Sequence, residues 1–152
     1  MKIVVIALLF PMILISQSNQ YLFLQTEIDA RNMIFGGTVN ERGYNGVFKA
    51  GFSAQWFRAD VFYETFAVLD YQTGGLNLTY ILRYDNPFKM GLGVQMGLIN
   101  KPRKLTPSVG LNGIVEYHIP PFFISARLER KVRTDWDIIV NSGFVGVGYR
   151  LN

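Results

Sequence analysis

The sequence contains no cysteine and only one histidine among its 152 residues. The absence of cysteine excludes disulfide bonds and thiolate metal sites as sources of stability. An excess of one charge is also lacking, because the formal net charge is only +4 and is scattered along the chain. A balance this mild argues against nucleic acid as a partner. Stability must therefore come from the backbone hydrogen bonds and the packing of the chain.

Long hydrophobic runs are absent except for one near the start, residues 3–15. At about 13 residues it is shorter than the roughly 20 that a membrane-spanning helix needs, and Pro11 within it disfavours a stable anchor helix. A short positive start precedes the run and small residues follow it, which is the pattern of a signal peptide. We expect residues 1–18 to be a signal peptide cleaved after Ser18, and 19–152 to be one mature domain. The alternative is an uncleaved N-terminal anchor.

The mature chain has, in place of helical periodicity, blocks of about ten to twelve residues in which apolar and polar side chains alternate. In one such block Phe48, Ala50 and Phe52 alternate with Lys49 and Gly51. Seven blocks of this kind follow one another, and an eighth strand lies somewhere within residues 20–39. The 12 Phe, 8 Tyr and 15 Gly suit strands and the narrow interior of a barrel.

The connections between the blocks alternate between short and long. We expect tight turns near 57–58, 85–87 and 120–121, and longer loops near 40–45, 70–75, 100–107 and 133–137. An up-and-down membrane barrel has this organisation, with tight turns on one side of the membrane and longer loops on the other. The pattern predicts an all-β fold, an eight-stranded antiparallel transmembrane β-barrel with a polar interior.

The distribution of charge indicates which face of the strands meets lipid. From the second to the seventh strand, Arg130 is the only charged residue on the apolar face. The opposite face carries ten charges: Lys49, Arg58, Asp60, Glu64, Arg83, Lys89, Glu116, Arg127, Glu129 and Lys131. Because a lipid-facing Lys or Arg costs about 2–4 kcal/mol at the bilayer midplane, the charged face should point inward. A soluble barrel with its polar face in water is the alternative.

We predict a connected interior network of salt bridges and hydrogen bonds that includes Glu64, Arg83, Glu116, Arg127 and Glu129. The aromatic residues agree with this assignment of the faces. One set falls beside the tight turns and the end of the last strand, and Tyr44, Tyr71 and Trp136 lie in or beside the long loops. The first set comprises Trp56, Tyr84, Phe88, Tyr117, Phe122 and Tyr149. Two aromatic belts are typical of membrane interfaces.

With these features, residues 20–152 resemble the small outer-membrane barrels of Gram-negative bacteria typified by the OmpA transmembrane domain and OmpX, and their style is similar to that of Bacteroidetes-type barrels. The segment 143–152 looks like the terminal strand that barrel-assembly machinery recognises, although such families usually end in an aromatic residue and this sequence has Asn152. The resemblance implies localisation in an outer membrane after signal-peptide cleavage, with outer-membrane lipids, lipopolysaccharide and the assembly machinery as partners.

The resemblance also raises an enzymatic alternative, because two lipid A-modifying enzymes of this size class depend on a histidine. His118 lies on the inward face beside a tight turn, away from the outer leaflet, and neither Ser108 nor Ser125 is well placed as a nucleophile for it. We therefore expect no enzyme activity, no catalytic residue, no cofactor and no metal site.

The basic residues Lys101, Arg103 and Lys104 are the candidate contact for anions or lipopolysaccharide, with a solvated loop as the alternative. We expect a structural or interaction role: membrane stabilisation, contact with lipopolysaccharide, or an accessory subunit of a larger outer-membrane complex. Eight strands leave no room for a wide pore. A soluble lipid-binding barrel of the lipocalin type is the second hypothesis, and a lipid A-modifying enzyme the third.

Overall fold

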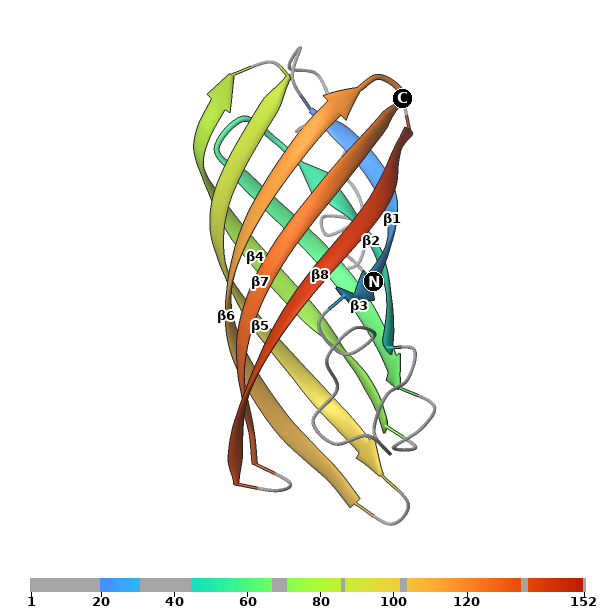
Figure 1. The fold of residues 1–152 in the computed structure, drawn as a ribbon, viewed down its shortest axis with the longest axis vertical. Helices are drawn as coiled ribbons and strands as arrows, with labels where there is room; N and C mark the ends of the chain where they lie inside the picture. The colour runs from blue at the N-terminus through green and yellow to red at the C-terminus, as the bar shows by residue number, and fades with distance from the viewer. Residues whose placement is uncertain are drawn as a thin grey trace, which may run out of the picture.

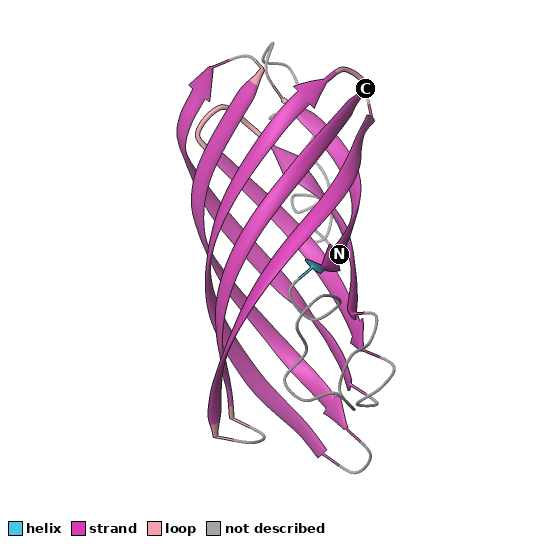
Figure 2. Ribbon diagram, viewed as in Figure 1, coloured by secondary structure: helices cyan, strands magenta, loops and turns pink. Residues whose placement is uncertain are grey.

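The computed structural model describes residues 20–30, 45–66, 71–85, 87–101, 104–134 and 137–151. Nearly all of them belong to strands (Figure 2). The strands are β1 (Tyr21–Asp29), β2 (Asn45–Ser53), β3 (Phe57–Phe66), β4 (Tyr71–Asp85), β5 (Phe88–Lys101), β6 (Lys104–Ile119), β7 (Phe122–Arg133) and β8 (Ile138–Leu151). The expected signal peptide, residues 1–18, lies outside the described residues.

The eight strands form one closed barrel in which each strand pairs antiparallel with the next, and β8 pairs with β1 (Figure 1). This confirms the fold class expected from the alternation. Within the described ranges, no helix is both long and apolar enough to cross a membrane.

The two ends of the barrel differ in their connections. The β2–β3, β4–β5 and β6–β7 turns and the end of β8 lie at one end of the barrel, which we call the tight-turn end (Figure 1). The last residues of β1, β3, β5 and β7 lie at the opposite end, which we call the loop end. The loop expected at 100–107 is wrong, because β5 and β6 stay paired as far as Lys101 and Lys104. Turn-forming and charged residues do not prevent backbone groups from continuing an antiparallel ladder. The same reason explains why β4 begins at Tyr71, inside the loop expected at 70–75.

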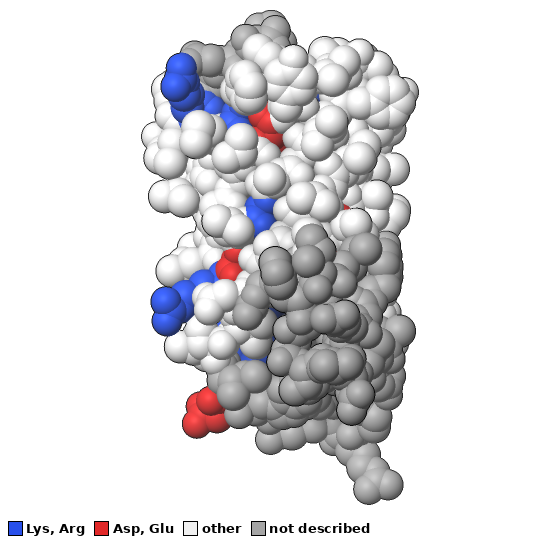
Figure 3. Space-filling model, viewed as in Figure 1, with Lys and Arg blue, Asp and Glu red and all other residues white. Residues whose placement is uncertain are grey.

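Exposure alternates along the strands and shows which face points inward. In β7, Arg127 is 2% exposed, whereas its neighbour Leu128 is 73% exposed. The charged face lines the interior and the apolar face forms the outer wall, so the described part of the surface in Figure 3 is mostly uncharged. Aromatic pairs lie on this outer wall at the tight-turn end, where Phe88 contacts Tyr117 and Phe122 contacts Tyr149.

Arg83 was predicted to point into the barrel, but its side chain is exposed. The pairing of β4 with β5 shifts by one residue between Ile81 and Arg83, so that Ile81 lies opposite Gly91 and Arg83 opposite Met90. A β-bulge of this kind inserts one extra residue and turns the following side chains to the other face of the sheet. The expectation that Arg83 points inward is therefore wrong.

The interior is filled by side chains along its length. Apolar clusters lie at different levels: Tyr21, Phe23 and Phe123 near the tight-turn end, and Phe66 with Ile99 near the loop end. Where β5 carries inward-facing glycine, the flanking strands occupy the space. A Cβ atom on Gly93 would lie 2.7 Å from both Asn112 Oδ1 and Thr79 Oγ1. Asn112 and Asn77, from the strands on either side of β5, meet there in a 2.8 Å hydrogen bond.

Candidate functional site

Arg127 is the centre of the interior charge network. From β7 its Nη2 lies 2.7 Å from Glu27 Oε2 on β1, and its Nη1 forms an ion pair with Glu129. The guanidinium also lies over the ring of Phe144, 4.0 Å from the centroid. A planar guanidinium suits this position because it can bind two carboxylates and stack on an aromatic ring at the same time.

Two lysines extend the network from this centre. Lys131 Nζ lies 2.8 Å from Glu129 Oε1 and 2.5 Å from Glu64 Oε2. On the other side, Lys49 Nζ lies 3.0 Å from Glu27 Oε1. Charges of opposite sign therefore alternate through the interior in the order Lys49, Glu27, Arg127, Glu129, Lys131 and Glu64. This pairing compensates for removing the charges from water.

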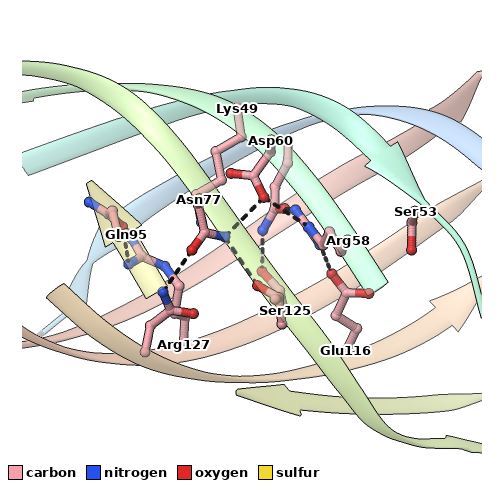
Figure 4. A network of polar contacts seen from close by, with 12 residues as sticks. Lys49, Ser53, Arg58, Asp60, Asn77, Gln95, Glu116, Ser125 and Arg127 are labelled. Carbon is pink, nitrogen blue, oxygen red and sulfur yellow. Dashed lines mark hydrogen bonds and ion pairs between the residues drawn. The ribbon is translucent and has the colours of Figure 1, made fainter. Parts of the chain in front are cut away.

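A second cluster, centred on Arg58, lies nearer the tight-turn end. The Arg58 side chain forms ion pairs with Glu116 on β6 and with Asp60, whose Oδ2 lies 3.2 Å from Nε (Figure 4). Its guanidinium lies 3.8 Å from the ring centroid of Phe23. It also donates to Gln25, which in turn donates to Glu27, so the two clusters are connected.

His118 belongs to the second cluster. Its Nε2 lies 3.0 Å from Glu116 Oε2, and Arg150 donates to its Nδ1 from 3.1 Å. Both ring nitrogens are therefore engaged by charged neighbours. The described contacts give His118 a structural environment, with Tyr21 and Phe123 packed against the ring.

The structure brings together four of the five residues predicted for the interior network: Glu64, Glu116, Arg127 and Glu129. Glu27 and Arg58, two central members, were not named in that prediction. The alternation placed Arg58 on the inward face but left the position of the first strand, which carries Glu27, undefined within residues 20–39. It also carries no information about which side chains meet across the barrel. Register and closure decide that, and neither can be derived from the pattern of one strand.

The candidate basic contact lies at the loop end. Lys101 ends β5, Lys104 begins β6, and the two are paired in the ladder. Arg103 lies outside the described residues. The structure therefore places two of the three basic residues at the tip of one hairpin rather than in a long loop.

No group of three or more His, Asp or Glu residues in the described ranges is arranged to hold a metal ion.

Known structures share this architecture. A de novo designed transmembrane β-barrel superimposes with a TM-score of 0.62 at 10% identity, covering 89% of this chain and 98% of the design. The Yersinia pestis outer membrane protein Ail gives a TM-score of 0.59 at 12% identity, covering 88% of this chain and all of Ail. Neisserial surface protein A gives 0.54 at 18% identity, covering 88% of this chain and 98% of that protein.

The chain has the fold of the small outer-membrane barrels. No family model matches the sequence, and neither does any curated protein. The predicted resemblance to this structural group is therefore confirmed by the fold, at sequence identities too low to carry a function across. The similarity to Bacteroidetes-type barrels stays a prediction.

Proposed function

We propose that the protein is a small outer-membrane barrel with a structural or interaction role, which stabilises the membrane through contact with lipopolysaccharide or serves a larger outer-membrane complex as an accessory subunit. The carrying observation is the inversion of polarity: the wall exposes large apolar side chains, whereas charged side chains on the same strands are buried and paired. A barrel surrounded by lipid, with no lipid in its interior, explains both the apolar outer wall and the charged inner face.

The interior contacts argue against a pore. Lys131 on β7 reaches Glu64 on β3, and these strands lie on opposite sides of the barrel. Arg58 on β3 reaches Glu116 on β6 at a different level. Side chains thus cross the lumen at two levels, as expected for eight strands. We expect no large, steady conductance in planar bilayers, and such conductance would contradict the proposal.

The basic hairpin tip supports contact with anionic headgroups. Lys101 and Lys104, with Arg103 between them in sequence, stand at the loop end, where such headgroups are expected if that end faces outward. Ail, which shares the fold, has been crystallised with the heparin analogue sucrose octasulfate, a highly anionic ligand. Replacing all three residues with Gln should reduce lipopolysaccharide retention without reducing the folded fraction.

Localisation is tested by fractionation. We expect recovery in the outer-membrane fraction, extraction only with detergent, and heat-modifiable migration on gels. Recovery from the periplasm or medium without detergent would favour the soluble lipocalin-like alternative, against which the charged and filled interior already argues.

Detergent-solubilised pull-down from the native host, read by mass spectrometry, tests the accessory-subunit role.

The enzymatic alternative has a separate test. Expression of the chain should leave the acylation of lipid A unchanged, and His118→Ala should therefore make no difference. A change in acylation that disappears in His118→Ala would overturn the non-enzymatic assignment.

A further inference from the structure

Arg130 is an unusual residue on the outer wall. It is exposed, it lies on the lipid-facing side of β7, and its neighbours in the ladder are the uncharged Leu111 and Asn141. No described ion pair includes it. A cation on a membrane wall is costly unless it reaches polar groups or pairs with an anion.

The wall beside Arg130 is hollowed. Two adjoining depressions share the outward-facing residues Leu92, Gly113, Leu128 and Gly143. These four residues form one row across β5, β6, β7 and β8, because each pairs with the next in the ladder. The glycines supply no side chain, so the wall is recessed on both sides of Leu128. We call this row, with Arg130 at its edge, the wall groove.

The depth of Arg130 in the membrane suits contact with a lipid headgroup. Phe122 lies in the aromatic group at the tight-turn end, and Arg130 is eight residues further along β7. Eight residues span roughly 26 Å along a strand, or about 20 Å along the membrane normal at a tilt of about 40°. The apolar band of such barrels is about 25 Å tall. Arg130 therefore lies toward the loop end of the band, where its long side chain can reach the interface.

We propose that the wall groove binds lipid A of the outer leaflet, with acyl chains along the recesses at Gly113 and Gly143 and a phosphate on Arg130. This rests on the proposed function, because it requires the loop end to face outward. Phosphate complements the guanidinium in charge and in hydrogen-bonding geometry. A lipid with several acyl chains and a phosphorylated headgroup can occupy both recesses while it binds the cation.

The test uses the full-length chain, purified in detergent and titrated with purified lipid A, phosphatidylglycerol or phosphatidylcholine, with binding read by native mass spectrometry. Arg130→Gln should weaken lipid A binding by about tenfold, the value of one charge-assisted contact. Gly113→Leu should also weaken it, because a leucine side chain would fill the recess that the acyl chain occupies. The matched controls are Arg83→Gln, an exposed arginine at the other end of the barrel, and Gly74→Leu, an exposed glycine on β4. Both controls should retain wild-type affinity.

Several outcomes would overturn the inference. They are undetectable lipid A binding, equal binding of phosphatidylglycerol, unchanged affinity in Arg130→Gln, or an oligomer lost in Gly113→Leu, which would assign the groove to a second copy of the chain. Heat-modifiable migration of each variant verifies that it is folded. A barrel that fractionates with the outer membrane yet binds no lipid A would contradict this inference alone, whereas recovery without detergent would contradict the proposed function.

Discussion

Lys131 and Glu64 form a salt bridge across the barrel, with Nζ 2.5 Å from Oε2, between strands on opposite sides of the lumen. Both side chains are about 5% exposed, so neither charge has water as an alternative partner. The bridge therefore ties two walls of the barrel together.

A double-mutant cycle on this bridge should give a measurable coupling energy. Lys131→Met removes this cation from Glu64, and Glu64→Gln removes this carboxylate from Lys131. The double variant should be more stable than the sum of the two losses predicts, by about 0.5–3 kcal/mol. Urea unfolding in detergent micelles measures all four proteins. Additive losses would show that the two charges do not interact.

Arg127→Leu should be far more damaging than Leu128→Ala, although the residues are adjacent. The first change leaves Glu27 and Glu129 buried without their shared cation, and removing one partner of a buried pair costs about 3–5 kcal/mol. The second shortens a side chain that is 73% exposed on the outer wall. The same unfolding assay compares the two. A neutral Arg127→Leu would mean that the faces have been assigned backwards.

Gly146→Ala should destabilise the barrel, whereas Gly143→Ala on the same strand should have little effect. A Cβ atom on Gly146 would lie 2.5 Å from the carbonyl oxygen of Thr26 and 2.7 Å from Glu27 Cγ. At Gly143 the nearest contact would be 3.7 Å, to Leu128 Cδ2. Overpacking typically costs about 1–3 kcal/mol. Equal effects of the two variants would show that the interior has spare room.

A new cation on the wall should be costly. Val94 is 43% exposed and points outward from the middle of β5. Val94→Arg should destabilise the folded state by about 2–4 kcal/mol when folding is measured into lipid vesicles. Val94→Leu is the control for size. If Val94→Arg folds as well as Val94→Leu, the wall does not face hydrocarbon.

The alternation of side chains was sufficient to predict eight strands, closure and the direction of most charges. It failed at Arg83 because a β-bulge changes the parity of a strand without changing its composition. It could not show that Arg127 meets Glu27, because that contact reaches over β8 and depends on Gly146 leaving the space empty. Contacts between strands that are not neighbours depend on register and on barrel curvature, which no single strand encodes.

The strands on the two sides of the barrel differ in length. β1 and β2 have nine residues and β3 has ten, whereas β4, β5 and β6 have 15, 14 and 16. About 9–11 tilted residues suffice to cross a bilayer, so the first three strands have no length to spare. Phe66 pairs with Tyr71 at the loop end, so the five further residues of β4, 81–85, lie at the tight-turn end, where they add roughly 16 Å of strand. In a membrane the β4–β5 hairpin would therefore project further than the turn between β2 and β3, and a protein that docks on this face of the membrane would meet that hairpin first.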